Sequence, residues 1–352
     1  MILSDAGAIG RIVDEMSAEV QEGPTIYQPS QFWKALGGRH TARISDGGFA
    51  SFKRTINTNY FNFLVADRRD DQFRALLKAW LRHPTPTVAS ARLLDWNGVE
   101  GEGRGRAFAL WRNRTVYAVF VALLWEYARR RDRLGLLERL EEPSLGGPML
   151  VRHRGRLISQ DLANSFVEFA AILEAFPTGI PEEATVIELG AGYGRLGWLL
   201  LSVLPRLRYI VVDIPPALAI AQEYLTRLFP DLPTVRFQRG TDHLAAGLPG
   251  VQLAFVTPNQ LEAMPALGAD LFINISSLHE MRPDQILHYI GVVRRHTAGV
   301  FYLKQWHTSV NADDGVTIRQ ADYPIPGSWE RIFERRHPVQ TGFFEAAYRV
   351  QG

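Results

Sequence analysis

The chain contains no cysteine among its 352 residues. That absence excludes disulfide bonds, thiolate metal sites and a cysteine nucleophile. Long hydrophobic runs are also absent: the most apolar stretch, from Thr115 to Trp125, is shorter than the roughly 20 residues that cross a bilayer. The first 16 residues carry Asp5, Asp14 and Glu15 and lack a basic start followed by an apolar core, so they do not resemble a secretory signal. We therefore expect a cytoplasmic protein.

A strong excess of charge of one sign is missing as well. The 39 lysines and arginines nearly balance the 37 acidic residues, for a formal net charge of +2. This charge is too small to indicate a nucleic-acid or membrane partner. The basic cluster from Arg129 to Arg133 is typical of a solvated helix end, where cations complement the helix dipole. No histidine–carboxylate spacing indicates a metal site, and we expect no metal.

The length and the distribution of proline and glycine predict two domains. Up to about residue 139 the apolar spacing is helical, and residues 107–131 are predicted to form one long buried helix. Proline and glycine then interrupt the pattern at residues 143–148. We therefore expect a helical N-terminal domain over residues 1–150 and an α/β domain over residues 151–352.

Helix and strand patterns alternate from Ser159 onward, which predicts a parallel sheet covered by helices. Ser159 itself is a plausible N-cap for the first of these helices. The remaining expected elements are, in chain order, a strand at 185–189, a helix at 195–204, a strand at 209–214, a helix from 215, short strands at 235–238 and 253–256, a strand at 271–275, a helix from 283 and a strand at 299–303. The pattern of residues 316–349 favours antiparallel strands that close the sheet, and it does not determine their register.

The first strand of this half runs into a glycine-rich turn that opens a helix. Gly190, Gly192 and Gly194 follow Glu188 in the pattern E-x-G-x-G-x-G. A dinucleotide-binding fingerprint has its third glycine one residue later, where this chain has Arg195. The spacing therefore disfavours an NAD-dependent oxidoreductase, and the whole run resembles the nucleotide loop of class I S-adenosylmethionine-dependent methyltransferases.

An acidic residue follows the next strand at the usual spacing. Asp213 comes about 20 residues after the glycine turn, and Ile214 follows it. A carboxylate there can accept hydrogen bonds from ribose hydroxyls, while turn amides at a helix N-terminus suit the methionyl carboxylate. Candidate cofactor-binding residues are thus Glu188, Gly190, Gly192, Gly194, Asp213 and Ile214. The alternative is a glycine turn that only packs strand against helix.

Two polar runs compete for the adenine end of such a cofactor. Asn259 and Gln260 follow the short strand at 253–256, and the run from Gly240 to Asp242 follows the other short strand. Either run is equally compatible with an ordinary polar turn. Asn274, at the end of the strand at 271–275, completes the candidates for the cofactor site.

The loop after that strand contains the best candidates for a general base. Transfer of a methyl group to an alcohol requires a base, because the hydroxyl is barely acidic. His279 has a near-neutral intrinsic pKa, and Glu280 could be the base itself or could orient an imidazole. The alternative is that His279 is a surface loop residue and Glu280 caps the helix that begins near Pro283.

The strand at 299–303 leads to further candidates at the same sheet edge. Trp306 could stack on a sugar face, and Lys304 and His307 could bind its hydroxyls. Tryptophan in such a position is equally compatible with the core. These three residues are candidates for binding an acceptor substrate.

Four runs resemble the sugar O-methyltransferase family of bacterial polysaccharide and natural-product gene clusters. They are residues 52–57 (FKRTIN) with Tyr60-Phe61, residues 158–165 (ISQDLANS), residues 188–194 (ELGAGYG) and residues 274–281 (NISSLHEM). Residues 302–306 (YLKQW) are similar to the last strand end of the family. The resemblance extends from about residue 30 to 310, and the second and fourth runs are its most specific parts.

The resemblance implies a Rossmann-like class I methyltransferase sheet with an α-helical N-terminal cap, and S-adenosylmethionine as cofactor. The implied reaction is O-methylation of a sugar or of a glycosylated natural-product or polysaccharide precursor. By analogy Gln160 faces the cofactor, and Asp161 lies beside it toward the acceptor. Lys53, Asn57 and Tyr60 belong to the acceptor side in the same way.

The chain departs from the family at one candidate: the position before Glu280 is often glutamine there, and His279 replaces it. This departure favours Glu280 as the base. Two other functions remain open, namely N- or phenolic O-methylation of a small natural product and non-catalytic binding of an adenosyl nucleotide. The expected partner is a small-molecule acceptor, with neither nucleic acid nor membrane, and a homo-oligomer is compatible with the sequence.

Overall fold

The computed structural model describes residues 5–31, 33–34, 37, 41, 48–55, 65, 67–95, 110–311 and 315–351. The chain divides into two compact units. Unit 1 comprises residues 1–46, 172–337 and 342–352, and unit 2 comprises residues 47–171 and 338–341. Within the described ranges, no helix is both long and apolar enough to cross a membrane.

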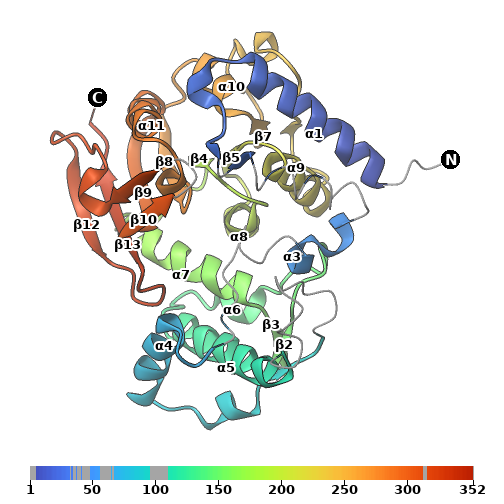
Figure 1. Cartoon of the computed structure of the whole chain (residues 1–352), viewed down its shortest axis with the longest axis vertical. Coiled ribbons are helices and arrows are strands. Elements are labelled where there is room, and N and C mark those ends of the chain that lie inside the picture. Colours follow the sequence, from blue (N-terminus) through green and yellow to red (C-terminus); the bar gives the residue numbers. More distant parts are fainter. Residues whose placement is uncertain are drawn as a thin grey trace. The chain divides into compact units, whose positions relative to one another are not determined.

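An eight-stranded sheet forms the centre of unit 1, in the order β12-β13-β9-β8-β4-β5-β7-β6 (Figure 1). Its strands are β4 (Thr185–Leu189), β5 (Arg208–Val212), β6 (Thr234–Val235), β7 (Leu253–Val256), β8 (Ala269–Ile275), β9 (Thr297–Trp306), β12 (Glu330–Arg336) and β13 (Phe343–Arg349). The six neighbouring strands β9, β8, β4, β5, β7 and β6 pair in parallel. Strand β13 pairs antiparallel with both β9 and β12. The order β7-β5-β4-β8-β9 is the 3-2-1-4-5 order of a Rossmann sheet.

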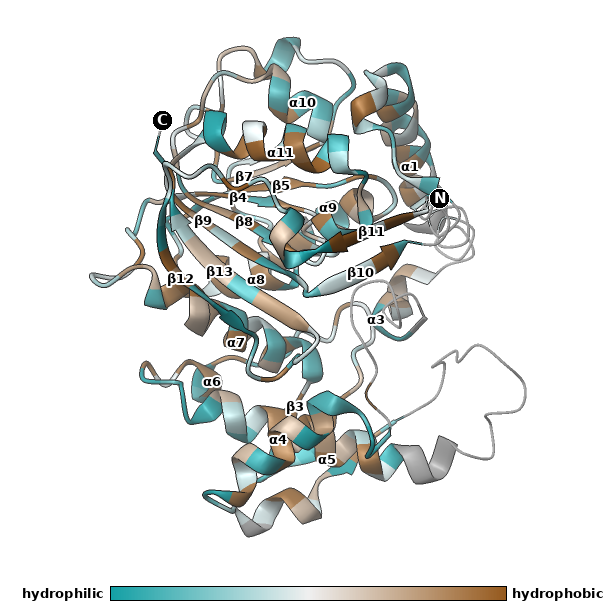
Figure 2. Cartoon of the chain, turned by 60° about the vertical axis from the view of Figure 1, so that its left-hand side comes forward, coloured by the Kyte–Doolittle hydropathy of each residue, from teal (hydrophilic) through white to brown (hydrophobic). Residues whose placement is uncertain are grey.

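The central strands are apolar because helices cover both faces of the sheet. Apart from their first residues, β4 and β5 are completely buried, and Figure 2 shows the central strands in hydrophobic colours. The edge strand β12 has exposed charged residues on either side of the half-buried Ile332 and Phe333, and it is largely hydrophilic in the same view. Charge on an exposed edge discourages pairing with other chains.

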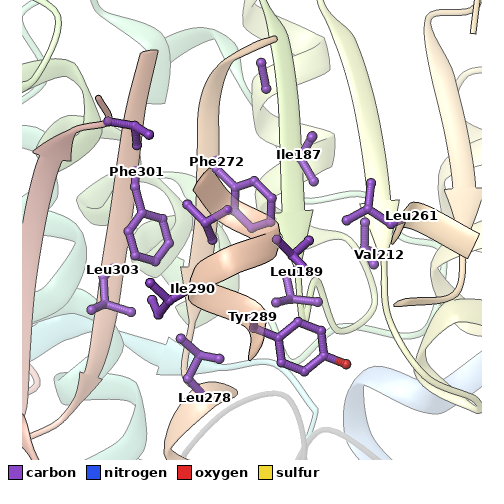
Figure 3. Close-up of a cluster of buried hydrophobic side chains, with 14 of the residues drawn as sticks. Ile187, Leu189, Val212, Leu261, Phe272, Leu278, Tyr289, Ile290, Phe301 and Leu303 are labelled. Atoms are coloured by element: carbon purple, nitrogen blue, oxygen red, sulfur yellow. The ribbon is translucent and has the colours of Figure 1, made fainter. Parts of the chain in front are cut away.

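Helices lie on both sides of this sheet (Figure 1). They are α1 (Asp5–Glu22), α8 (Arg195–Val203), α9 (Ala217–Leu228), α10 (Pro258–Ala263) and α11 (Pro283–His296). One apolar cluster joins the strands to α11, with Phe272 of β8 and Phe301 of β9 facing Ile290 (Figure 3). The hydroxyl of Tyr289 points away from that cluster.

The connections of unit 1 contain short 3-10 turns and one hairpin. They are η1 (Thr25–Tyr27), η4 (Asp242–Leu244), η5 (Leu278–Glu280), η6 (Gln320–Asp322), and the antiparallel pair β10 (Thr308–Asn311) and β11 (Val316–Arg319). Strand β6 is shorter than the expected 235–238. The amide of Phe237 donates to the side-chain oxygen of Gln222 in α9 at 2.7 Å, so the chain has left the sheet by that point.

Unit 2 combines helices with a small antiparallel sheet, in the order β1-β2-β3. Its elements are η2 (Gly48–Ser51), α3 (Phe52–Thr55), α4 (Asp71–Leu81), η3 (Pro86–Ser90), β1 (Arg92–Leu93), α5 (Leu110–Arg129), α6 (Leu136–Arg139), β2 (Val151–His153), β3 (Arg156–Ile158) and the first turns of α7 (Gln160–Glu174). Helix α5 is buried from Val116 to Ala128, as its apolar pattern predicts. Ser159 caps α7, because its hydroxyl accepts the amide of Leu162 at 3.0 Å.

The two units differ from the division expected at residue 150. Helix α1 packs against α9 and is part of unit 1. Its Ile9, Val13 and Met16 repeat at helical spacing and are at most 2% exposed. An N-terminal helix with an apolar face joins whichever core buries that face, whatever its position in the chain.

Candidate active site

The turn after β4 requires glycine. Gly190, Gly192 and Gly194 have φ angles of 75°, 60° and 83°, in the left-handed region that side chains disfavour. A Cβ atom at Gly190 would lie 2.4 Å from Oγ of Ser277, so there is no room for a side chain. The turn therefore brings bare backbone to the carboxyl end of β4, with the first amides of α8 directly behind it.

Asp213 faces this turn from the neighbouring strand. Its Oδ2 accepts the amide of Gly192 at 2.8 Å, and its Oδ1 accepts the amide of Ile214 at 2.7 Å. Burial is the main cause that raises the pKa of Asp213, to about 7. The two backbone hydrogen bonds lower that pKa, and the charge of Glu280 raises it further. The structure thus brings together the turn and the carboxylate that the sequence spacing predicts.

Glu188 lies beneath the turn and is buried. Its Oε2 accepts a hydrogen bond from the hydroxyl of Tyr209 in β5. The ring of Tyr209 also lies against Gly197, where an added Cβ would be 2.6 Å from the ring. Tyr209 therefore supports both the strand and the first turns of α8, a role that nothing in the sequence indicated.

The two polar runs that compete for the adenine end lie side by side. Gln260 is completely buried, and its Nε2 donates to the carbonyls of Gln238 and Gly240 at 2.7 and 2.8 Å. Its Oε1 accepts the amide of Thr257 at 3.1 Å. The side chain of Gln260 thus joins the β6–η4 loop to the start of α10. Both of its N–H groups are used by backbone carbonyls.

Asn259 faces the N-terminal helix. Its Nδ2 donates to Oε1 of Glu19 at 2.9 Å, and Oε2 of Glu19 accepts the amide of Gly240 at 2.9 Å. The buried Oδ1 of Asn259 has no hydrogen-bond partner within the described ranges. Sequence reasoning missed Glu19, because a helix some 200 residues away along the chain carries no local signal for this edge.

Asn274 connects the glycine turn to the loop that follows β8. This side chain is completely buried, and its Nδ2 donates to the carbonyl of Leu189 at 2.8 Å and to Oγ of Ser277 at 2.7 Å. Its Oδ1 accepts Nε2 of Gln305 at 2.5 Å. Every polar atom of the Asn274 side chain thus has a protein partner, so Asn274 holds the edge together.

His279 lies in η5 and is only 4% exposed, so it is not a surface loop residue. Its Nδ1 is 2.9 Å from Oε1 of Gln305, and its Nε2 is 3.4 Å from Oε1 of Glu280. The ring also makes edge contacts with the aromatic rings of Trp306 and Phe343. The imidazole is therefore held at a defined orientation, with one nitrogen toward an amide oxygen and the other toward a carboxylate.

Glu280 does not cap the following helix. Helix α11 begins at Pro283, and the amide of Arg282 donates to Oε1 of Gln285 at 3.2 Å. The Oε2 atom of Glu280 is buried and unpartnered among the residues that the structure describes. The hydroxyl of Tyr323 is in the same state, and burial and the charge of Glu280 raise its pKa. Sequence reasoning missed Tyr323, which lies in the tail whose register it could not read.

The end of β9 carries the three candidates for acceptor binding. Lys304 is buried, with Nζ 5.5 Å from the centre of the Phe343 ring. Trp306 packs on the same ring at 4.5 Å between centres. His307 approaches Oε1 of Gln320 with Nδ1 at 2.7 Å, and its buried Nε2 has no partner in the described part of the chain. Trp306 therefore combines a packing role with a place beside His279.

The remaining candidates that the structure describes belong to unit 2. Lys53 forms a buried ion pair with Glu142 at 2.5 Å, and Ser159 donates to the other oxygen of Glu142 at 2.6 Å. Gln160 and Asp161 are buried in the first turn of α7. Burial, Asp161 and Glu142 together raise the pKa of Tyr117 in the same unit.

Asn57 and Tyr60, both expected on the acceptor side, lie outside the described residues. No group of three or more histidine, aspartate or glutamate side chains in the described ranges is arranged to hold a metal ion.

A scan against protein-family models finds no match, and a search of curated proteins finds none either. Solved structures do resemble the chain. A SAM-dependent methyltransferase from Aquifex aeolicus is 12% identical, and the match covers 52% of this chain and 89% of that one with a TM-score of 0.35. A 1,6-didemethyltoxoflavin N1-methyltransferase from Burkholderia thailandensis, with S-adenosylhomocysteine bound, is 16% identical. That match covers 55% of this chain and 79% of that one, with a TM-score of 0.35.

The strand order of unit 1 independently defines its fold. Five parallel strands follow the order β7-β5-β4-β8-β9, helices cover both faces, and the glycine turn follows the central strand β4. Unit 1 of this chain therefore has a Rossmann-like α/β fold, as the sequence predicts.

Proposed function

We propose that the chain is an S-adenosylmethionine-dependent O-methyltransferase that acts on a hydroxyl of a sugar or of a glycosylated precursor. The observation that carries the cofactor assignment is the bond from the amide of Gly192 to the buried carboxylate of Asp213. It puts an acceptor of hydrogen bonds beside a turn of bare amides at a helix N-terminus. This combination suits ribose hydroxyls on one side and a carboxylate on the other.

The residues around the turn fit the cofactor by size and by polarity. A Cβ at Gly190 would lie 2.4 Å from Oγ of Ser277, so only glycine lets the turn pack against that residue. At the far edge, Oδ1 of Asn259, which has no partner among the described residues, can accept a hydrogen bond from an exocyclic amine such as that of adenine. Gln260 supports this edge through its two backbone contacts.

Methyl transfer requires a base beside the substrate hydroxyl that receives the methyl group. S-adenosylmethionine, when bound, supplies a methyl group whose C–S bonding electrons stay on sulfur, so the acceptor oxygen gains the methyl and gives up its proton. His279 and Glu280 form the candidate pair for that proton, since Nε2 and Oε1 lie 3.4 Å apart in a mostly buried loop. The imidazole of His279 takes the proton, and the carboxylate of Glu280 stabilises the resulting cation.

Polar atoms near the candidate base support the class of acceptor. Three buried polar atoms have no partner in the part of the chain that the structure describes: Oε2 of Glu280, the hydroxyl of Tyr323 and Nε2 of His307. They offer hydrogen bonds to a molecule with several hydroxyls. The motif resemblance to sugar O-methyltransferases points the same way. In this proposal Lys304 and Trp306 border the acceptor. The polar residues of unit 2, with Lys53, Gln160 and Asp161 among them, make up the acceptor-side domain.

Calorimetry tests the cofactor assignment. Substitution of Asp213→Ala removes the carboxylate that would hold the ribose, and we expect about 100-fold weaker binding of S-adenosylmethionine. Asp231→Asn, at an exposed turn, is the matched control and should bind like the wild type. Wild-type protein that ignores S-adenosylmethionine at millimolar concentration would contradict the proposal.

The acceptor class needs a separate measurement. The wild-type protein should convert S-adenosylmethionine to S-adenosylhomocysteine in the presence of a sugar or glycoside acceptor. Turnover only with amines or phenols would replace the sugar by the alternative acceptor class. Tight cofactor binding without turnover on any acceptor would favour a non-catalytic adenosyl-nucleotide-binding protein.

A further inference from the structure

Gln305 occupies the centre of the hydrogen-bond chain at the sheet edge. It lies in β9, is completely buried and contacts side chains of both β8 and η5. Its Nε2 lies 2.5 Å from Oδ1 and 3.4 Å from the carbonyl oxygen of Asn274. Its Oε1 lies 3.2 Å from the amide nitrogen and 2.9 Å from Nδ1 of His279.

These four contacts determine which way the amide of Gln305 points. The amide nitrogen of His279 is a donor only, so it must face an oxygen. The carbonyl oxygen of Asn274 is an acceptor only, so it must face an N–H group. The reverse orientation would put two donors together at His279 and two acceptors together at Asn274. Gln305 therefore presents its oxygen, and not its NH₂ group, to the imidazole.

The orientation of Gln305 in turn determines the tautomer of His279. An amide oxygen can only accept a hydrogen bond, so Nδ1 of His279 must carry a proton in both the neutral and the charged ring. The lone pair of the neutral ring is then on Nε2. That atom lies on the side of the ring that faces Glu280.

The chain of amides begins at the glycine turn. The carbonyl of Leu189, the last residue of β4, accepts from Asn274 at 2.8 Å, Asn274 accepts from Gln305, and Gln305 accepts from His279. Each link uses atoms that cannot exchange donor and acceptor roles without leaving a buried group unpaired. The backbone of the proposed cofactor loop and the imidazole are thus held in one continuous network.

We infer that Gln305 is a positioning residue that keeps His279 in the Nδ1–H tautomer, so that Nε2 receives the proton of the acceptor hydroxyl. This inference rests on the proposed function. As the acceptor oxygen bonds to the methyl group, its O–H bond breaks and the proton passes to Nε2. The imidazolium that results still donates from Nδ1 to Gln305 and faces the carboxylate of Glu280 at Nε2. The proton then leaves to water.

A neutral amide suits this role better than a carboxylate. A glutamate at position 305 would also accept from Nδ1, but its charge would stabilise the imidazolium before the acceptor arrives. The ring would then stay protonated to higher pH and be unable to take a proton. Gln305→Glu is consequently a rescue variant: it keeps the tautomer and moves the acidic limb of the pH–rate profile to higher pH.

Nitrogen NMR of histidine-labelled protein tests the inference without turnover. Long-range proton–nitrogen correlations show which ring nitrogen carries the proton, and His279→Gln identifies the signal among the nine histidines. When its ring is neutral, wild-type His279 should be the Nδ1–H form. Gln305→Met should populate the Nε2–H form, and Gln305→Glu should restore Nδ1–H.

Gln222→Met is the matched control for loss of a buried glutamine. Gln222 is 2% exposed and accepts one backbone amide, from Phe237, away from the candidate base. Its substitution should lower thermal stability about as much as Gln305→Met and leave the His279 signal unchanged. If Gln305→Met does not fold, the wild type and Gln305→Glu still decide the tautomer.

Turnover separates the inference from the function on which it rests. Gln305→Met should lower kcat about 100-fold with little change in KM, within the range expected for loss of a general base. An Nε2–H form in the wild type, or a Gln305→Met variant with wild-type kcat, would overturn the role of Gln305. Should the wild type bind the cofactor and methylate no alcohol, the proposed function fails, while the NMR signal still shows whether Gln305 sets the tautomer.

Discussion

Both units contain buried carboxylate oxygens, and the hydrogen-bond partners of these oxygens differ between the units. In unit 2, Glu126 accepts hydrogen bonds from His153, Arg129 and Arg154. In unit 1, Asp213 is bonded to backbone amides, and one oxygen of Glu280 has no partner in the described ranges. A buried charge that is fully paired holds a fold together, whereas one left without a cation is kept at a cost in stability. The two units thus differ in whether their carboxylates are paired with cationic side chains.

The pKa values show the same contrast. Burial by itself raises the pKa of Glu126, but the hydrogen bonds from His153, Arg129 and Arg154 outweigh it and lower the pKa to about 2. For Asp213 burial is again the largest cause, and it outweighs the two backbone hydrogen bonds, so the pKa rises to about 7. Glu126 therefore stabilises the folded state at neutral pH, and ionised Asp213 destabilises it.

The largest expected effect concerns the paired carboxylate. Glu126→Gln removes the charge and leaves His153 and two arginines without their counter-ion, so we expect the free energy of unfolding to fall by about 3 kcal/mol. This difference in the free energy of unfolding should have its full size above pH 4.5. It should disappear as the pH falls toward 2, because the wild-type carboxylate becomes protonated there. Urea denaturation at several pH values measures it. An equally stable variant at pH 7 would show that the contacts of Glu126 are not structural.

Glu280→Gln addresses the carboxylate of unit 1 that faces His279. The variant keeps the shape of the side chain and loses the charge that faces Nε2 of His279, so we expect turnover to fall about 100-fold, equivalent to about 2.7 kcal/mol. Cofactor affinity should not fall, because the charge of Glu280 disfavours ionised Asp213. Glu183→Gln, at an exposed glutamate, is the control. Wild-type turnover in Glu280→Gln would remove Glu280 from the proton transfer.

Asp213→Asn should have the smallest effect, and its sign is opposite to that of Glu126→Gln. The folded state holds the Asp213 proton up to about pH 7, whereas an unfolded aspartate loses it near pH 3.8. The wild type therefore loses stability as the pH rises through this window, and the asparagine variant does not. The pKa difference of about 3 is equivalent to about 4 kcal/mol at pH 8. The NH₂ group of asparagine cannot accept one of the two backbone amides, which costs about 2 kcal/mol, so the ligand-free variant should be more stable by about 2 kcal/mol. Thermal unfolding from pH 5 to pH 8 tests the sign, and a less stable variant at pH 8 would contradict it.

Local sequence signals predicted the framework of the site closely. The strand before the glycine turn spans residues 185–189 in both the prediction and the structure, and the strand at 253–256 likewise matches. Both are short apolar runs bounded by residues that end a strand, so their limits depend on neighbours in the chain. The acidic residue after β5 follows in the same way, since strand spacing in an α/β unit places it next to the turn.

Partners across strands were beyond such signals. Nothing in the apolar pattern of its strand indicates a role for Gln305. It contacts His279 because the register between β8 and β9 puts the two residues side by side. Glu19 meets Asn259 only because α1 joins unit 1. Asn274 and Gln260, expected to bind the cofactor, have their N–H groups committed to protein oxygens, which the spacing of motifs could not show.

The linear order of residues by itself determined the elements of the α/β unit, the glycine turn and the acidic residue one strand away. These features depend on contacts between near neighbours in the chain and on the few conformations that glycine and proline allow or forbid. Strand order and register decided which groups face the two ring nitrogens of His279 and which groups face Asp213. Those properties depend on atoms that only folding brings within hydrogen-bonding distance, where burial makes each unpaired charge costly.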